Sequence, residues 1–298
     1  MKKDIDLITV LGWEERFIKG LEETIDKFLI KKIILIRFGD YLFMDNMQNN
    51  INRINELQLN HHFAIEYIDL NYNDSVENWN VLESFFCDIE NTRKFLLNIS
   101  TVPRETIWTL FFFLKKYVAN VEYIYFKPRN YCKDWLTKNH KSPRLLFKHS
   151  GIFDLNKDLV LFVIAGFDNT RLDQIIEFYE PSKVVIFYQE GEQFNNHDRN
   201  KDFECYKNRG VEFCEIFSIN TYNVEEATDV LLKKYDEYRD KHNVIIDSQG
   251  PKISALSVYN VYLKTDNKIG LAYVAAKDFN LNYSSGIDNH FISGNFKF

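Results

Sequence analysis

The chain has 298 residues, enough for about two domains of ordinary size, and its 45% hydrophobic and 27% charged residues predict a globular protein with a sizeable core. Its formal net charge is −6 and its pI is about 5.7. This balance argues against non-specific binding of long nucleic acid, which relies on many Lys and Arg contacts to phosphate, but it allows a local basic pocket for one small anionic ligand.

The cysteines and the apolar segments predict a cytoplasmic protein. Cys87, Cys132, Cys205 and Cys214 are far apart and form no C-x-x-C pair, so neither a disulfide framework nor a zinc knuckle is expected. The opening MKKDIDLITVLGWEERF lacks the long apolar core of a signal peptide. The most apolar stretch, IWTLFFFL at residues 107–114, is too short to span a bilayer, so no membrane partner is expected.

The first half of the chain alternates apolar strands with helices. An apolar strand opens residues 7–40, and the segment Gly12-Trp13-Glu14, a helix and a second strand follow it. A third strand lies in residues 62–73, a fourth begins at 94 and leads into an apolar helix, and a fifth occupies 121–128. The strands are continuously apolar rather than alternating, which is typical of a parallel sheet covered on both faces.

The second half repeats this order, which indicates an internal duplication. Residues 161–192 align with 7–40, so that Gly166-Phe167-Asp168 falls on Gly12-Trp13-Glu14. Residues 243–264 align with 94–117, which places Pro251-Lys252 on Pro103-Arg104. We predict a first domain at 1–130, a connector at 131–155, a second domain at 156–277 and a C-terminal extension at 278–298.

The predicted fold class is α/β, with two duplicated Rossmann-like halves, each a mainly parallel five-stranded sheet between helices. Right-handed crossovers favour this doubly wound arrangement. In such a sheet the first strand lies beside the fourth, and ligands bind at the carboxyl ends of the strands flanking that switch point. The repeated Gly-aromatic-acid and Pro-basic segments both fall at this edge, once in each half.

The segment DSQGPK, residues 247–252, illustrates the chemistry expected there. Proline is tolerated in the first turn of a helix, Gly250 allows close backbone approach, and free N–H groups at a helix start bind anions beside the charge of Lys252. The alternative is that these residues only begin a helix. Because the pattern occurs twice at predicted ligand edges, we favour ligand binding. The predicted ligand-binding residues are Gly12, Trp13, Glu14, Arg16, Ser100, Thr101, Arg104, Gly166, Phe167, Asp168, Arg171, Ser248, Gln249, Gly250 and Lys252.

Two acids and two arginines in this set have alternative explanations. Glu14 and Asp168 either complement a helix dipole or accept hydrogen bonds from a ribose or base. Arg16 and Arg171 either reach a phosphate or pair with those acids. The sequence leaves both alternatives open.

The strand that ends in small polar residues, the basic residue at a helix start and the glycine after strand one together resemble the CARF family of cyclic-oligonucleotide sensors in antiviral defence. Two copies fused in one chain look like the related SAVED arrangement. The resemblance implies that Arg104 and Lys252 approach ligand phosphates, and that Gly12, Trp13, Gly166 and Phe167 line base or ribose pockets at the joint of the repeats. Neither half has the Thr-Gly-Gly-x-Lys form common in that family.

The leading functional hypothesis is therefore a sensor of a cyclic or other nucleotide that signals to a separate effector protein. No motif predicts a metal site, a P-loop, a serine-hydrolase elbow or a dinucleotide cofactor, so no cofactor is expected. The histidines, among them His140 and His149, are expected at the surface or in the connector. The alternatives are a nucleotide-processing enzyme, either a nucleotide-sugar transferase or a ring nuclease, and a protein-interaction scaffold. No catalytic residue can be assigned.

Overall fold

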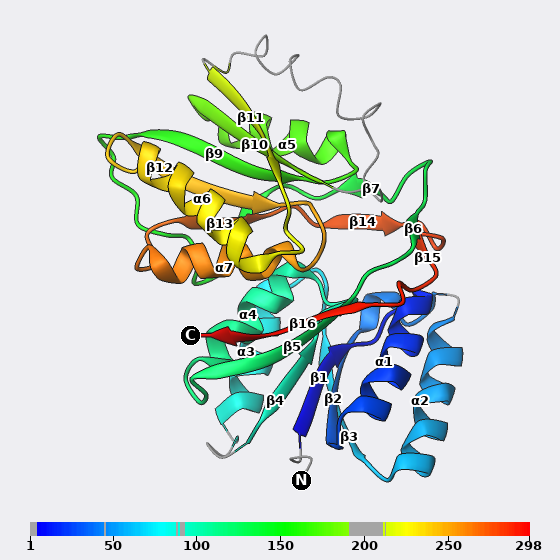
Figure 1. Ribbon diagram of the computed structural model, residues 1–298. Helices are drawn as coiled ribbons and strands as arrows, with labels where there is room; N and C mark the ends of the chain where they lie inside the picture. The colour runs from blue at the N-terminus through cyan, green and yellow to red at the C-terminus, as the bar shows by residue number, and fades with distance from the viewer. Residues whose placement is uncertain (1–4, 45, 88, 90–92, 191–210, 212) are drawn as a thin grey trace. The chain divides into compact units, whose positions relative to one another are not determined.

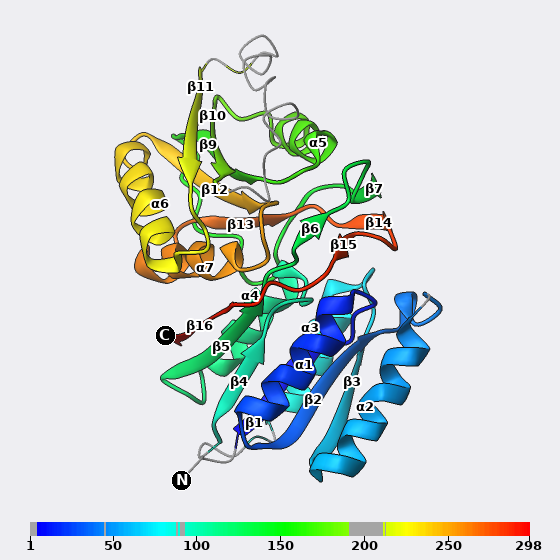
Figure 2. The ribbon, with the colours of Figure 1, turned by 45° about the vertical axis from the view of Figure 1, so that its right-hand side comes forward.

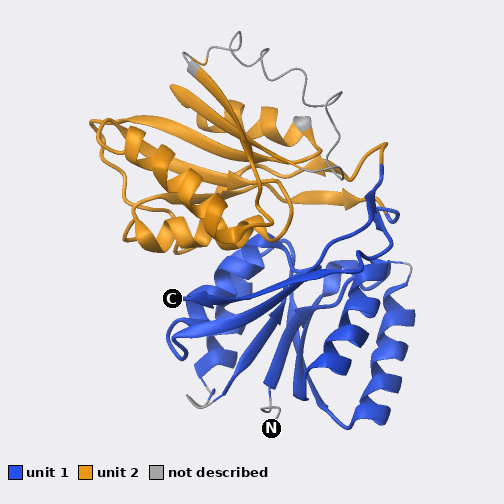
Figure 3. Ribbon diagram, in the orientation of Figure 1, with its two compact units in different colours: residues 1–132, 281–298 blue, residues 133–280 orange. Residues whose placement is uncertain are grey.

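The computed structural model describes residues 5–44, 46–87, 89, 93–190, 211 and 213–298. The chain divides into two compact units, coloured separately in Figure 3. The first comprises residues 1–132 and 281–298, and the second comprises residues 133–280. Each unit is described by itself.

The first unit contains a six-stranded sheet with the order β16-β5-β4-β1-β2-β3 (Figure 1). All neighbours pair in parallel except β16, which runs antiparallel to β5. The strands are β1 (Ile5–Val10), β2 (Ile30–Phe38), β3 (Ala64–Leu70), β4 (Phe95–Asn98), β5 (Asn120–Phe126) and β16 (Phe291–Lys297). The predicted neighbourhood of the first and fourth strands is therefore present.

The described helices that connect these strands are α1 (Glu15–Lys27), α2 (Met47–His61), α3 (Ser75–Cys87) and α4 (Arg104–Leu114). A short 3₁₀ turn, η1 (Gly39–Tyr41), follows β2. The chain moves outward in one direction through β2 and β3 and then returns past β1 to β4 and β5. Because parallel crossovers are right-handed, this reversal places α1 and α2 on one face of the sheet and α3 and α4 on the other (Figure 2).

The apolar helix α4 is buried almost all round because aromatic side chains meet it from two elements. The rings of Trp79 in α3 and Phe113 in α4 lie 4.7 Å apart between centroids. The ring of Phe111 in α4 lies 4.4 Å from that of Phe296 in β16. The C-terminal strand thus contributes to the core of the first unit as well as to its sheet.

The second unit repeats the topology, with a six-stranded sheet in the order β11-β10-β9-β12-β13-β8. Only β8 is antiparallel to its neighbour. The strands are β8 (Arg144–Leu145), β9 (Asp158–Ala165), β10 (Lys183–Gln189), β11 (Phe213–Ile219), β12 (His242–Ser248) and β13 (Gly270–Tyr273). The described helices are α5 (Asn169–Tyr179), α6 (Val224–Tyr238) and α7 (Ser254–Lys264).

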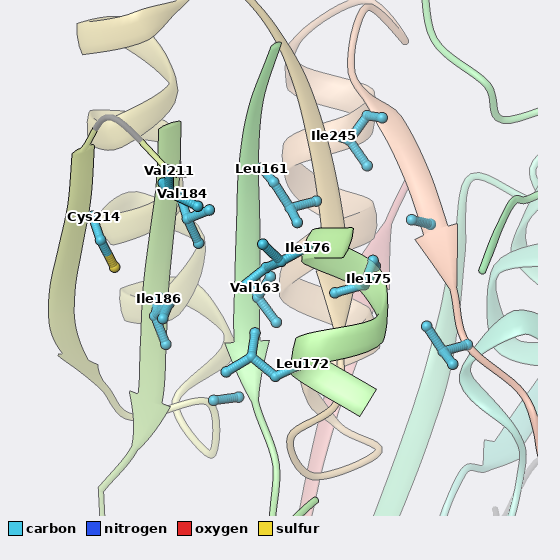
Figure 4. Packing of buried hydrophobic residues seen from close by; sticks show 13 residues of the cluster. Leu161, Val163, Leu172, Ile175, Ile176, Val184, Ile186, Val211, Cys214 and Ile245 are labelled. Carbon is cyan, nitrogen blue, oxygen red and sulfur yellow. The ribbon is translucent and has the colours of Figure 1, made fainter. Parts of the chain in front are cut away.

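The core of the second unit follows from the apolar strands. Leu172 and Ile175 of α5 pack onto Leu161 and Val163 of β9, as Figure 4 shows. Each of these side chains is at most 1% exposed. At about 25 cal/mol per Å² of apolar surface removed from water, such burial is the main force that holds the helix on the sheet.

Two short strand pairs involve the segments next to the unit boundaries. In the first unit, β6 (Asn130–Tyr131) pairs with β15 (Ser284–Ser285). In the second, β7 (Thr137–His140) pairs with β14 (Ala276–Phe279).

The predicted fold class of two Rossmann-like, mainly parallel α/β halves is confirmed. The antiparallel sixth strand of each sheet was not predicted, because β8 is only two residues long and β16 includes Gly294 and Asn295. Within the described residues, none of the helices combines the length and apolarity needed to cross a membrane. Cys87, Cys132 and Cys214 are free thiols, and Cys205 lies outside the described residues.

Candidate ligand-binding edges

The loops after the first and fourth strands of each sheet touch at the switch point. A Cβ placed on Gly12 would lie 3.0 Å from the side chain of Thr101, and one on Gly166 would lie 2.2 Å from the carbonyl oxygen of Gln249. The second contact is with backbone, so only glycine fits at 166 without moving a loop. We call residues 12–16 with 98–104 the first edge, and residues 166–171 with 247–253 the second edge.

Polar side chains of the first edge bond to one another and to the sheet. Asn98 Oδ1 accepts hydrogen bonds from the Ser100 amide (3.1 Å) and hydroxyl (2.7 Å). The same hydroxyl accepts from the Phe126 amide at 2.9 Å, and Thr101 Oγ1 donates to the Val10 carbonyl at 2.9 Å. The hydroxyls of Ser100 and Thr101 therefore already hold strands β1, β4 and β5 together.

Glu14 and Arg16 form a buried ion pair in the first edge. Arg16 Nε and a terminal nitrogen donate to the Glu14 carboxylate at 2.9 and 3.1 Å, and the two side chains are only 1% and 5% exposed. Ser284 of β15 also donates to Glu14. Burial alone would lower the pKa of Arg16, but the Glu14 charge outweighs it, and the pKa is raised. Of the two alternatives for these residues, the structure places them in the internal pair.

The other predicted residues of the first edge differ in exposure. Trp13 is half-buried, with its ring centroid 6.2 Å from that of Tyr41. Arg104 is buried and is the first residue of α4, directly after Pro103. The Gly12 carbonyl accepts from Asn50 Nδ2 of α2 at 2.7 Å. Its backbone is thus anchored from the helix as well as packed on Thr101.

At the second edge, a buried carboxylate holds a buried amide. Asp247, at the end of β12, is 0% exposed, and its Oδ2 accepts from Gln249 Nε2 at 2.7 Å. The Gln249 backbone amide donates to the Ile164 carbonyl at 2.8 Å. Gln249 is 6% exposed, and its Oε1 has no hydrogen-bond partner among the described residues. A buried acceptor without a donor costs about 1–3 kcal/mol, so it indicates a place for one.

Helix α7 begins later than the sequence indicated. Its first residue is Ser254, two after Lys252, and the amides of Ser254 and Ala255 donate to the carbonyls of Pro251 and Lys252. Ser254 Oγ lies 2.5 Å from Ser248 Oγ, and both residues are fully buried. These two helical amides and both hydroxyls are therefore occupied, which leaves Lys252, half-buried, as the cationic residue of the turn.

Asp168 caps α5 and pairs with a histidine of the connector. It accepts from the Thr170 amide at 3.1 Å, from Thr137 Oγ1 at 2.8 Å and from His140 Nε2 at 2.8 Å. Burial alone would raise the pKa of Asp168, but the hydrogen bonds from His140, Thr170 and Thr137 and the charge of His140 hold it below its usual range. Phe167, just before this cap, is half-buried.

Two histidines of the predicted connector are buried. The His140 side chain is 6% exposed, and His149 is fully buried with its ring 5.0 Å from that of Tyr262. Thr137 and His140 complete the surroundings of Asp168 and were missed. The sequence gives no signal for them, because they reach Asp168 through the pairing of β7 with β14, two segments far apart in the chain.

Arg171 has the same structural role as Arg16. Its guanidinium donates to the Val274 carbonyl just after β13 at 2.5 Å, as Arg16 reaches the Phe126 carbonyl at the end of β5 at 3.5 Å. Each arginine thus ties the helix after strand one to the end of strand five. Arg171 is 8% exposed, and its Nε, like Gln174 Oε1 on the next turn, has no hydrogen-bond partner within the described part of the chain.

The described residues contain no group of three or more His, Cys, Asp or Glu side chains that could hold a metal ion. The polar side chains described at the second edge include the Asp247 carboxylate, the Gln249 amide and the Arg171 guanidinium.

No protein-family model and no curated protein matches the chain. Among solved structures, the chain is similar to a Type III CRISPR defence DNA nuclease activated by cyclic oligoadenylate, with a TM-score of 0.58 and 9% identity. The match covers 87% of this chain and 64% of the nuclease chain, so the chain spans less than two thirds of that protein. At this identity the likeness shows the fold, which agrees with the two Rossmann-like halves predicted from the sequence.

Proposed function

We propose that the chain senses a nucleotide ligand, a cyclic oligonucleotide in the first instance, in antiviral defence signalling. The fold that it shares with a nuclease activated by cyclic oligoadenylate supports this ligand class. The proposal places the ligand at the second edge. The counterpart residues of the first edge stay predicted ligand contacts.

One observation carries the proposal. At the switch point of the second sheet, the Gly166 and Gln249 loops are in backbone contact, and Gln249 presents a buried acceptor that no described residue satisfies. Ligands of doubly wound sheets bind at this edge. Lys252, half-buried beside it, is proposed to approach a ligand phosphate, and Phe167 to lie against a base or ribose.

The signal is proposed to pass to a separate effector protein.

A thermal-shift panel tests the proposal. Purified protein is screened with cyclic di-, tri-, tetra- and hexa-adenylate, linear oligoadenylates and common nucleotide sugars. A ligand at 100 times its Kd adds about 2.7 kcal/mol of apparent stability. We expect one cyclic species to raise the melting temperature, and Lys252→Glu to abolish the rise. Lys183→Glu is the matched control, because Lys183 is also half-buried but begins β10 at the opposite end of the sheet.

The other outcomes assign the alternatives. A shift with a nucleotide sugar alone favours a transferase, and breakdown of a cyclic oligonucleotide after binding favours a ring nuclease. A panel without any shift, beside a stable complex with another protein, favours a scaffold and contradicts the sensor.

A further inference from the structure

The orientation of the Gln249 amide follows from its hydrogen bond to Asp247. Gln249 Nε2 donates to Asp247 Oδ2 at 2.7 Å. The carbonyl Oε1 therefore points away from Asp247. It is the atom of the amide without a partner among the described residues.

We propose that Gln249 selects ligands that offer a hydrogen-bond donor, and that Asp247 is the positioning residue that keeps the acceptor facing the ligand. This inference rests on the proposed nucleotide-sensing function. In an adenine nucleotide the donor is either the exocyclic amine of the base or a ribose hydroxyl.

The electrostatics favour a donor rather than a phosphate at this point. Gln249 Oε1 carries partial negative charge, and the Asp247 carboxylate lies directly behind the same amide. A phosphate oxygen would be repelled, whereas an amine or hydroxyl would complete the unused bond. Adenine and cytosine present an amine where guanine and uracil present a carbonyl oxygen.

The described residues of the first edge do not include a corresponding pair, in which one side chain holds an amide so that its acceptor stays unpaired. Asn98 occupies the position that corresponds to Asp247, and its Oδ1 is filled by the amide and hydroxyl of Ser100. Thr101, which packs on Gly12 as Gln249 packs on Gly166, donates to the Val10 carbonyl. Selection by an exposed acceptor is therefore a property of the second unit, and Asn98 shows that an asparagine fits at this strand position.

The test compares ligands that differ in one donor. The protein is titrated calorimetrically with cyclic tetra-adenylate, its inosine counterpart, in which a carbonyl replaces the base amine, and its 2′-deoxy counterpart. Where the panel favours another ring size, that size is used throughout. Loss of the donor that meets Gln249 leaves a buried acceptor unpaired, so we expect about a tenfold to hundredfold weaker binding for one of the two analogues. The analogue affected identifies the amine or the hydroxyl as the donor.

Two variants test whether Gln249 and Asp247 cause the difference in affinity between these ligands. Met has a similar length to Gln and no carbonyl acceptor. In Gln249→Met, cyclic tetra-adenylate and the analogue that wild-type protein binds more weakly should therefore have Kd values within about threefold of each other. In Asp247→Asn the residue at 247 can donate as well as accept, so the Gln249 amide is free to turn. Discrimination should then fall or reverse, while melting of the unliganded variant remains cooperative.

The outcomes distinguish failure of the inference about Gln249 from failure of the proposed nucleotide-sensing function. Wild-type protein that binds all three ligands equally, or Gln249→Met that keeps the full discrimination, overturns the inference alone. Protein that binds no cyclic or linear oligonucleotide overturns the proposed function, and the inference with it.

Discussion

The two units share a strand order but differ in how their edges are completed. Both place the first strand between the second and the fourth, and both tie the following helix to strand five through an arginine, Arg16 or Arg171. The first edge is filled by an internal ion pair and by hydroxyls bonded to the sheet. The second edge instead leaves a buried acceptor, Gln249 Oε1, unpaired within the described residues. The two units thus share the frame, while the polar residues at their edges differ.

The largest expected difference between the units is in the loss of unfolding free energy when Glu14 or Asp168 is replaced by its amide. Glu14→Gln leaves the Arg16 charge buried without its partner, which typically costs about 3–5 kcal/mol of unfolding free energy. Asp168→Asn keeps an N-cap and loses only charge-assisted bonds to His140 and two threonines, so we expect about 1–2 kcal/mol. Urea unfolding of both variants measures the difference. Equal losses would mean that the Glu14 pair is no more essential to its unit than the cap.

The glycines after the first strands come next. Gly166→Ala pushes a Cβ against the Gln249 carbonyl, and overpacking of this kind costs about 1–3 kcal/mol. Gly12→Ala meets the Thr101 side chain at 3.0 Å, and we expect a cost below about 1 kcal/mol. Ligand binding should weaken in Gly166→Ala, because Gln249 is displaced. Gly166→Ala protein with unchanged stability and affinity would contradict the tight contact at the second edge.

The smallest effect is a pH dependence at the Asp168 cap. Its pKa is lowered in the folded state, so the unfolded state binds the proton more tightly. The stabilisation is therefore complete above the ordinary Asp pKa of about 3.9 and is lost as the pH falls further. The stability difference between wild type and Asp168→Asn should be constant from about pH 6 to pH 5 and shrink below about pH 4. A difference that grows in acid would have the wrong sign for a lowered pKa.

The sequence predicted the frame well because the frame depends on patterns that are local and repeated. Continuous apolar strands indicated a parallel sheet, and right-handed crossovers then placed β1 beside β4 and β9 beside β12. The loops that carry Gly12 and Gly166 consequently fell at the predicted edge. These inferences needed only the order and character of the segments.

Details of the edge could not be predicted because they depend on contacts between distant segments. His140 reaches Asp168 only through the pairing of β7 with β14. Helix α7 starts at Ser254, two residues after Lys252, and the Ser254 hydroxyl and amide both bond back to the Pro251 carbonyl. The orientation of Gln249 depends on the burial of Asp247, which the letters DSQGPK do not reveal.

The most direct test of ligand binding at the second edge is amide hydrogen exchange with and without the cyclic oligoadenylate that gives the largest thermal shift. Slower exchange in residues 166–171 and 247–254 is expected, because a ligand held by Gln249 and Lys252 suppresses local opening of both loops. Slower exchange confined to residues 12–16 and 98–104, or no change in either edge at saturating ligand, would contradict binding at the second unit.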